Sequence, residues 1–375
     1  MSKEIYAIST LVATIVGVGI FSLPYVAARV GLPAMLLYFF ALSALLLLFY
    51  LILAEISLAT PDYKRLPGFA EYHLGPAAKN IALGAMVLSS FGSILAYLII
   101  GGDFLAGLLD PFFRSAGLDA SNSVPFFTFV YWALGAAMIF LGIKTVAKTS
   151  FWALILLFAV LGMLLFYGLP FWRPENLMVK TGGLQDIFLP YGAIVFSLWG
   201  ADMIPEIEEM LGKKKFLLKK VIFKTLLIVL AIYLFFIFLS LGVAGAEINS
   251  SAIASLGAIV GPQASIFGYI FGLLASFTSF IATGLTLKKI FHYDMKISKV
   301  ASFGLTCFVP LIMFFAGFNN FLAVVSLIGG VMLGVNGILI LAMYRKIKPG
   351  NNFLLLPLAL VLLAGVAGEV IQFIN

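Results

Sequence analysis

Two stretches of this sequence share one pattern: TIVGVGIFSLPY at residues 14–25 and FSLWGADMIPE at residues 196–206. In each stretch a glycine is followed five residues later by a proline, Gly19 by Pro24 and Gly200 by Pro205. Glycine weakens a helix, whereas proline is tolerated in the first turn of a new helix. The pattern therefore predicts two helices, each interrupted near its middle by unwound backbone.

The sequence around both stretches is that of a membrane protein. Hydrophobic residues make up 63% of the 375 residues and charged residues only 10%, whereas a soluble domain carries about 25% charged residues. The apolar residues lie in blocks of about 18 to 27, the length that a helix needs to cross about 30 Å of hydrocarbon. We therefore expect an all-α membrane protein.

The apolar blocks predict eleven transmembrane helices in one transporter domain over residues 1–375. Between them, the segment 245–262 carries Glu247, Asn249 and several serines, and we interpret it as an extracellular loop. The predicted spans are residues 5–29, 33–58, 80–109, 124–142, 150–171, 187–210, 216–243, 263–290, 300–317, 321–344 and 353–374.

The charges of the predicted loops indicate how the chain is oriented. Loops on one side hold 19 of the 23 lysines and arginines, and loops on the other side hold four. Basic residues concentrate in cytoplasmic loops, so we expect a multi-pass plasma-membrane protein with a cytoplasmic N-terminus and an extracellular or periplasmic C-terminus. The lysine run at 213–224 then fixes the topology beside the lipid bilayer, and we expect no nucleic-acid partner.

The two interrupted spans occupy equivalent places in the chain. They are the first spans of two sets of five, repeat one at about 5–171 and repeat two at about 187–344, with an extra helix at 353–374. An odd number of spans inverts the second set, and interrupted helices at matching positions of inverted repeats mark the binding site of a transporter. The alternative is that these glycines and prolines only allow close helix packing.

An interrupted helix offers the two groups that bind an α-amino acid. Free amides at the start of a half-helix attract a carboxylate, and released carbonyls at the end of the other half attract an ammonium group. We expect the backbone of Gly17, Val18 and Gly19 to bind the carboxylate, and the carbonyls around Phe196–Trp199 to bind the amine.

Three short motifs connect this pattern with a known family. Residues 17–25 read Gly-x-Gly-Ile-x-x-x-Pro-Tyr, residues 51–58 are a leucine-rich run with a glutamate, and residues 205–210 are an acidic segment that begins Pro-Glu-Ile. The chain resembles the amino acid–polyamine–organocation superfamily, with its LeuT-type five-plus-five inverted repeat. It is most similar to the branch of aromatic and hydroxy amino acid permeases and amino acid/auxin permeases. The resemblance covers nearly the whole chain and implies a substrate site between spans 1, 3, 6 and 8.

The breaks and the resemblance together define a predicted substrate site with an aromatic wall. Such a wall favours a neutral, bulky substrate side chain. The predicted substrate-binding residues are Gly17, Val18, Gly19, Ile20, Phe21, Tyr97, Phe196, Ser197, Trp199 and Gly200.

Span 8 contains a candidate ion site. Ala275, Thr278 and Ser279 share one helix face, and sodium-coupled members of the LeuT-type fold have a similar Ala-x-x-Thr-Ser arrangement. The resemblance implies a sodium site built from the carbonyls of Ala13, Val16 and Ala275 and the hydroxyls of Thr278 and Ser279. A simple packing face of small residues is the alternative. The interior of span 5 lacks the lysine that some proton-coupled relatives use, which favours sodium or an uncoupled mechanism, although the aromatic permease branch is regarded as proton-driven.

Acidic residues inside the spans are functional candidates by default. Asp202, just after the second break, is the first candidate for proton coupling, and Asp103 in span 3 is the second. Four glutamates lie nearer the cytoplasmic ends, where we expect them to pair with the lysine-rich loops: Glu55, Glu206, Glu208 and Glu209.

The sequence therefore predicts a secondary transporter that imports amino acids by ion-coupled symport, acts as a monomer and needs no cofactor beyond its coupling ion. An exchanger or facilitator for amino acids or polyamines on the same fold is the alternative. We expect no enzymatic activity, because His73 and His292 lie outside the spans and no His-Glu-x-x-His motif occurs. The single cysteine, Cys307, excludes a cysteine metal site.

Overall fold

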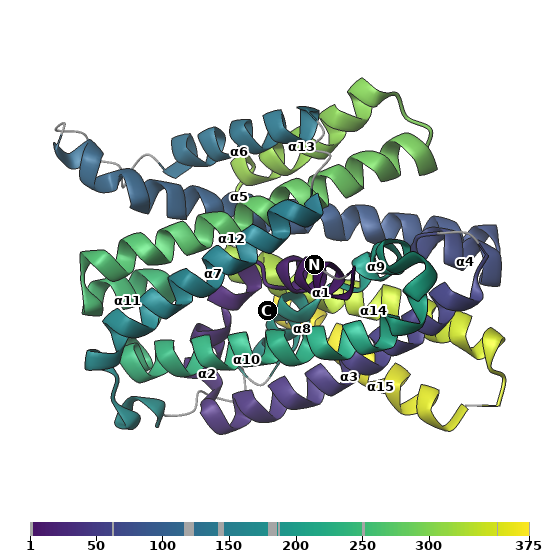
Figure 1. The fold of residues 1–375 in the computed structure, drawn as a ribbon, viewed down its shortest axis with the longest axis horizontal. Helices are drawn as coiled ribbons and strands as arrows, with labels where there is room; N and C mark the ends of the chain where they lie inside the picture. The colour runs from purple at the N-terminus through teal and green to yellow at the C-terminus, as the bar shows by residue number, and fades with distance from the viewer. Residues whose placement is uncertain are drawn as a thin grey trace.

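The computed structural model describes residues 3–61, 64–115, 124–141, 146–178, 186, 188–249, 252–350 and 352–374, which form an all-helical bundle without a strand among them (Figure 1). Short 3-10 helices, written η, occur at the breaks and helix ends, and η9 is a π-helical turn. The long helices are α1 (Lys3–Ile15), α2 (Leu23–Val30), α3 (Leu32–Ala59), α4 (Leu66–Leu74), α5 (Pro76–Ser115), α6 (Val124–Leu141), α7 (Val146–Gly168), α8 (Leu189–Leu198), α9 (Ile204–Leu211), α10 (Leu218–Ala244), α11 (Ala252–Val260), α12 (Pro262–Lys289), α13 (Lys299–Phe315), α14 (Phe321–Ile347) and α15 (Asn352–Ile374).

Each of the eleven predicted spans coincides with one of these helices or with a broken pair of them. By length and composition, seven described segments could cross a membrane, and the bent pair α1 and α2 makes an eighth. Residues 189–247, which contain α8, α9 and α10, are counted as one of these seven segments. The helical membrane fold is therefore confirmed, whereas the exact number of spans stays a prediction.

Both predicted breaks are present, and glycine and proline lie where the backbone changes direction. α1 ends at Ile15, Gly17 is extended (φ −117°, ψ −153°), and the turn η1 (Val18–Phe21) leads into α2, whose first turn holds a proline. The axes of α1 and α2 differ by 51°. In the second break α8 ends at Leu198, and the turn η6 (Ala201–Met203) leads into α9, which again has a proline in its first turn.

The helices pack in two groups, which Figure 1 shows one above the other. In the first, which we call the α5 group, α5, α6, α12 and α13 all contact one another. In the second, the α10 group, α1, α2, α3, α8, α9 and α10 pack together and include both broken spans. α4 packs on α5 and α14, and α14 touches both groups.

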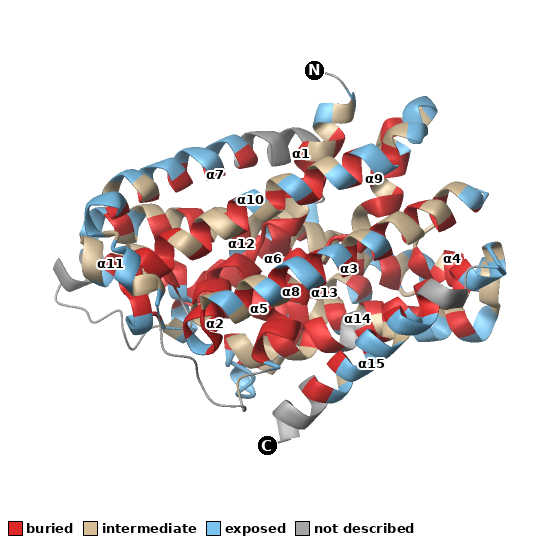
Figure 2. Cartoon of the chain, turned by 90° about the horizontal axis from the view of Figure 1, so that it is seen from below, coloured by how far each residue is buried: buried red, intermediate tan, exposed pale blue. Residues whose placement is uncertain are grey.

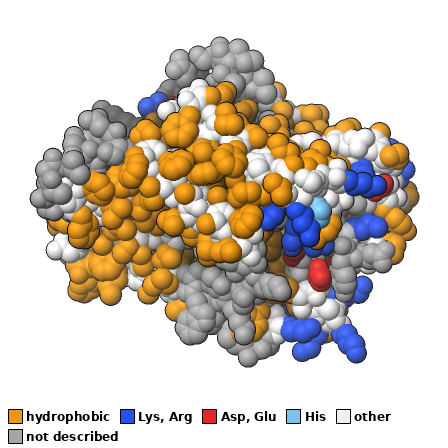
Figure 3. Space-filling view, turned by 90° about the horizontal axis from the view of Figure 1, so that it is seen from above, with side chains coloured by type: hydrophobic (Ala, Val, Ile, Leu, Met, Phe, Trp, Pro, Cys, Tyr) orange, Lys and Arg blue, Asp and Glu red, His pale blue; other side chains and the backbone are white. Residues whose placement is uncertain are grey.

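Much of the described outer surface is apolar. Exposed residues follow the outward faces of the helices (Figure 2), and many of them are large hydrophobic side chains such as Leu37, Phe140 and Phe166. Basic side chains gather at one end of the face in Figure 3, while the rest of that face is largely hydrophobic. This distribution fits a bundle whose sides face lipid and whose ends face water.

Two segments between the predicted spans contain helices that the sequence analysis did not predict. The segment 245–262, expected to be a loop, holds α11, whose sequence AIASLGAIV buries Ile253 and Leu256 against neighbouring helices. The segment before α5 holds α4, which starts with Pro67 in its first turn and ends at Gly75 with a positive φ of 99°. Both helices are nine residues long, too short to give a span-length apolar block.

A close backbone contact joins α8 and α14. A Cβ atom on Gly329 would lie 2.1 Å from the carbonyl oxygen of Gly192, so only glycine lets the two helices approach this closely. This contact presses α14 against the first half of the broken sixth span.

We expect Gly329→Val to separate α8 from α14 and to lower the free energy of unfolding by about 1–3 kcal/mol or more, the cost of overpacking a dense interior. Thermal unfolding of the purified protein in detergent measures the effect. Gly304→Val in α13 is the matched control, since nothing lies within 4 Å of a Cβ built there. Equal melting temperatures for the two variants would contradict the proposed packing.

Candidate substrate site between two broken helices

A small cavity of about 40 Å³ lies between the two breaks and the middle of α5. Its volume is below that of typical small-molecule sites, about 300–1,000 Å³. The α10 group supplies both breaks, and the α5 group supplies one face of α5, so the cavity lies where the two groups meet. Its lining residues are Thr14, Ile15, Gly17, Val18, Gly19, Ser93, Tyr97, Phe196, Ser197 and Trp199.

The structure brings most of the predicted substrate residues to this cavity. Ile20, Phe21 and Gly200 are the three predicted residues that are not in its lining. The seven predicted residues that do line it are Gly17, Val18, Gly19, Tyr97, Phe196, Ser197 and Trp199.

Phe21 instead belongs to an aromatic cluster beside the first break. Its ring is fully buried and lies 4.9 Å from the ring of Phe104, 5.3 Å from Phe271 and 6.0 Å from Phe236, measured between centroids. Gly200 also has a packing role, because a Cβ there would lie 2.5 Å from Cγ1 of Ile15. Ile20 is fully buried.

Sequence reasoning missed three lining residues, Thr14, Ile15 and Ser93. Ser93 had a usable signal, because it lies four residues before Tyr97 and therefore on the same face of its helix. Thr14 and Ile15 precede the first break directly, and their hydrophobic surroundings gave no sign of a role.

The two breaks approach each other so closely that glycine is required. A Cβ on Gly19 would lie 2.6 Å from the Cα atom and 2.5 Å from the Oγ atom of Ser197. A Cβ on Gly17 would lie 3.2 Å from the Oγ atom of Ser279 on α12, which is tight but involves only a side-chain end. Gly19 thus sets the distance between the broken helices, and Gly17 that between the first break and α12.

Two buried tyrosine hydroxyls satisfy carbonyl groups that the breaks release. The hydroxyl of Tyr233, on α10, lies 2.8 Å from the carbonyl oxygen of Ile15 and 2.7 Å from that of Ser197. The hydroxyl of Tyr50, on α3, donates to the carbonyl of Leu198 at 2.5 Å. A hydroxyl carries one proton, so Tyr233 donates to one carbonyl at a time. Sequence reasoning missed both tyrosines.

These contacts refine how an amino acid would bind. The N–H of Gly17 donates to the carbonyl of Ile15 at 2.8 Å, so the amides of Val18 and Gly19, the first of η1, are better placed for a carboxylate. Of the carbonyls expected near the amine, those of Ser197 and Leu198 face tyrosine hydroxyls. A carbonyl oxygen has a second lone pair, which an ammonium group can use.

The candidate sodium ligands lie where α1 and α12 pack together. Ser279 is buried beside Gly17, and its hydroxyl makes no hydrogen bond of acceptable geometry with any described residue, although the hydroxyl of Tyr97 lies near it. The Thr278 hydroxyl donates to the carbonyl of Leu274 at 2.8 Å and lies 3.2 Å from that of Ala275. Ala13 is in the last turn of α1, and Val16 directly follows it.

The two candidate acids differ in their relation to the cavity. Nε1 of Trp199, whose side chain lines the cavity, donates to Oδ2 of Asp202 at 3.1 Å. Asp103 lies on α5 six residues beyond Tyr97, has an exposed side chain and is not in the lining. The geometry therefore favours Asp202 over Asp103 as the acid coupled to the site.

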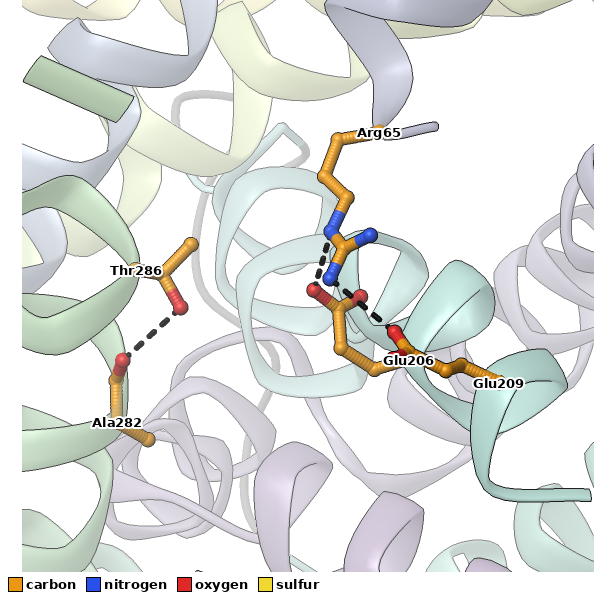
Figure 4. A network of polar contacts seen from close by, with 5 residues as sticks. All are labelled: Arg65, Glu206, Glu209, Ala282 and Thr286. Carbon is orange, nitrogen blue, oxygen red and sulfur yellow. Dashed lines mark hydrogen bonds and ion pairs between the residues drawn. The ribbon is translucent and has the colours of Figure 1, made fainter. Parts of the chain in front are cut away.

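Ion pairs of the four glutamates agree with the expected pairing, with one change of partner. Glu55 pairs with Lys219 at 2.5 Å and Lys348 at 2.7 Å. Glu208 accepts a hydrogen bond from Ser57 and lies 3.8 Å from Lys215. Glu206 and Glu209, in contrast, share Arg65 rather than a lysine, at 2.7 Å and 3.6 Å (Figure 4).

The model of the tryptophan/tyrosine permease family matches residues 1–373, and the chain belongs to this family, an aromatic permease branch of the superfamily expected from the motifs. The chain is therefore a secondary transporter of the LeuT type and not an enzyme. No curated protein sequence matches the chain.

Solved transporters share this fold at low sequence identity. Mhp1, a nucleobase-cation-symport-1 family transporter in a closed conformation with bromovinylhydantoin bound, superposes with a TM-score of 0.69 at 16% identity over 99% of this chain and 89% of its own. MhsT in complex with L-phenylalanine gives the same TM-score and identity over 99% and 98% of the two chains. An inward-facing Mhp1 gives 0.66 at 16% identity over 98% and 88%.

We expect Gly19→Ala to reduce substrate uptake at least tenfold, because the new methyl group would collide with the backbone of Ser197 and force the breaks apart. Gly17→Ala should reduce uptake less, since only the end of the Ser279 side chain must move. Uptake into vesicles, normalised to the amount of folded transporter, measures both. Wild-type uptake in Gly19→Ala would contradict the close approach of the breaks.

Tyr233→Phe should lower the free energy of unfolding by about 1–3 kcal/mol, because a released helix-end carbonyl loses its donor in a dry interior. The matched control is Tyr131→Phe, whose hydroxyl is buried without a hydrogen bond of acceptable geometry to the described residues, although the hydroxyl of Ser276 lies near it. Thermal unfolding in detergent compares the two. An equal loss in both variants would mean that Tyr233 acts only through its ring.

Proposed function

We propose that this protein imports neutral amino acids with bulky, aromatic side chains by ion-coupled symport with alternating access. The observation that carries the proposal is the cavity between the two breaks, whose ten lining residues include three aromatic rings and no charged side chain. The name of the family, and the L-phenylalanine bound to MhsT, support an aromatic amino acid as substrate.

Each part of an amino acid has a matching group in the cavity. The amides of Val18 and Gly19 would bind the carboxylate at the positive end of η1. The carbonyls of Ser197 and Leu198 would accept from the ammonium group. The rings of Tyr97, Phe196 and Trp199 would contact the substrate side chain, and aromatic pairs contribute about 0.5–1.5 kcal/mol each beyond area burial. Ile20, Phe21 and Gly200 would pack behind the residues that line the cavity and so help to set its shape.

Two sites are proposed for the coupling ion. Sodium would bind among the carbonyls of Ala13, Val16 and Ala275 and the hydroxyls of Thr278 and Ser279; the buried hydroxyl of Ser279 supports this site. A proton would bind Asp202, which the hydrogen bond from Trp199 connects to the cavity.

The assembly and orientation are also proposed. One chain suffices for transport, because both breaks and the cavity wall belong to the same chain. The N-terminus lies in the cytoplasm and the C-terminus outside, as the loop charges favour.

Uptake of labelled tryptophan, tyrosine and phenylalanine into proteoliposomes under a sodium gradient, a proton gradient or none tests the function. Accumulation with sodium alone, lost in the double variant Thr278→Ala, Ser279→Ala, is the result expected for the sodium site. Accumulation with a proton gradient alone, with a flattened pH profile in Asp202→Asn, is expected for the proton site. Uptake only into vesicles preloaded with amino acid would replace symport by exchange, and no transport of any amino acid by folded protein would overturn the proposal.

A further inference from the structure

Arg65 forms an ion pair between the two helix groups at the end of the bundle where basic side chains gather. It directly precedes α4, which packs on α5, and it holds two carboxylates of α9. Its Nε atom lies 2.7 Å from Oε1 of Glu206, and its Nη2 atom lies 3.6 Å from Oε2 of Glu209 (Figure 4). α9 is the second half of a broken span and belongs to the α10 group.

Three other polar contacts at this end lie within one group or join neighbouring helices on one side. Lys224 pairs with Glu4 at 2.7 Å, which joins α10 to α1. Ser57 donates to Glu208, which joins α3 to α9. The pair of Lys79 and Glu71, 2.9 Å apart, joins α5 to α4. These three contacts would persist if the two groups moved apart, whereas the contacts of Arg65 with α9 would break, together with the 2.8 Å contact between Oγ1 of Thr60, at the end of α3, and Nε2 of His73 in α4.

The end of α12 faces the same carboxylates. Lys289 lies close enough to act electrostatically on Glu206, and Thr286, three residues earlier, lies on the same helix face. Figure 4 places Thr286 across from Arg65, Glu206 and Glu209. Burial raises the pKa of Asp294, just beyond α12, and nearby Lys79 and Arg65 oppose this rise. Arg65 therefore lies between acids of α9 and an acid that follows α12.

The break before α9 determines what the ion pairs of Arg65 with Glu206 and Glu209 can hold in place. Residues 199 and 200 are not helical, so α9 can turn relative to α8 without the loss of a regular helix. One oxygen of Glu206, Oε2, is buried without a hydrogen-bond partner among the described residues, so its carboxylate is compensated chiefly by the ion pair with Arg65, with a smaller contribution from Lys289.

We propose that Arg65 is a latch that holds α9 against the α5 group and keeps the route between the cavity and this end of the bundle closed. Release of Glu206 and Glu209 lets α9 swing and exposes the face of α12 that carries Thr286. The inference deepens the proposed function, since it assigns the residue that controls access to the same cavity, but it does not depend on which amino acid or ion is carried.

The test is the rate at which a membrane-impermeant maleimide labels Thr286→Cys in a Cys307→Ala background, in permeabilised membranes without substrate. Arg65→Gln and Glu206→Gln should each raise the rate about fivefold or more, the shift that loss of about 1 kcal/mol gives a two-state equilibrium. Because both variants break the pair of Arg65 and Glu206, adding Glu206→Gln to Arg65→Gln should change the rate little. The reversed pair, Arg65→Glu with Glu206→Arg, should lower the rate toward that of the parent.

Glu71→Gln and Lys79→Gln are the matched controls. They break an ion pair at the same end of the bundle, but this pair joins α4 to α5 and does not cross the proposed opening. Their labelling rates should stay within about twofold of the parent. An unchanged rate in Glu206→Gln, or an equal increase in the controls, would overturn the latch, even if Arg65→Gln failed to fold. Labelling requires no transport, so failure of the latch is distinguishable from failure of the proposed uptake of aromatic amino acids.

Discussion

A single hydroxyl group, that of Tyr233, connects the two places where this bundle departs from regular helix. It lies within hydrogen-bonding distance of the last carbonyl of α1 and of Ser197 near the end of α8. Unpaired carbonyls in a lipid-embedded interior cost several kcal/mol each, so breaks of this kind persist only where the protein supplies donors. The breaks persist because these donors come from neighbouring helices, and Gly19 lets the breaks approach one another around the cavity.

The position of the breaks was predictable from sequence because it depends on local chemistry. Glycine followed by proline weakens one helix and starts another, whatever packs around them, and six residues at these motifs line the cavity as expected. The helical fold was predictable for a similar reason, since a bilayer demands long apolar segments of any chain that crosses it. α4 and α11 escaped prediction because they are too short to produce a block of that length.

The roles of Tyr50, Tyr233 and Phe21 could not be read from the sequence, because each depends on contacts between distant segments. A tyrosine in an apolar span needs a partner for its hydroxyl, but the sequence does not tell which carbonyl that is. The ring of Phe21 follows the first break just as a substrate contact would, yet the structure turns it into a cluster with Phe104, Phe236 and Phe271. Similarly, the acidic residues of α9 suggested lysine partners, whereas Arg65 reaches Glu206 and Glu209 from the segment before α4.

The length of α5 sets how deep the cavity lies in the bundle. Its 40 residues make a rod of about 60 Å, twice the thickness of the hydrocarbon layer of about 30 Å. Such a helix must tilt, extend into water or do both, and its tilt is set by the helices packed against it. Ser93 and Tyr97 lie near the middle of this rod, so the cavity that they line is about equally far from its two ends. A molecule that reaches the cavity from either end therefore has to pass about half the length of α5.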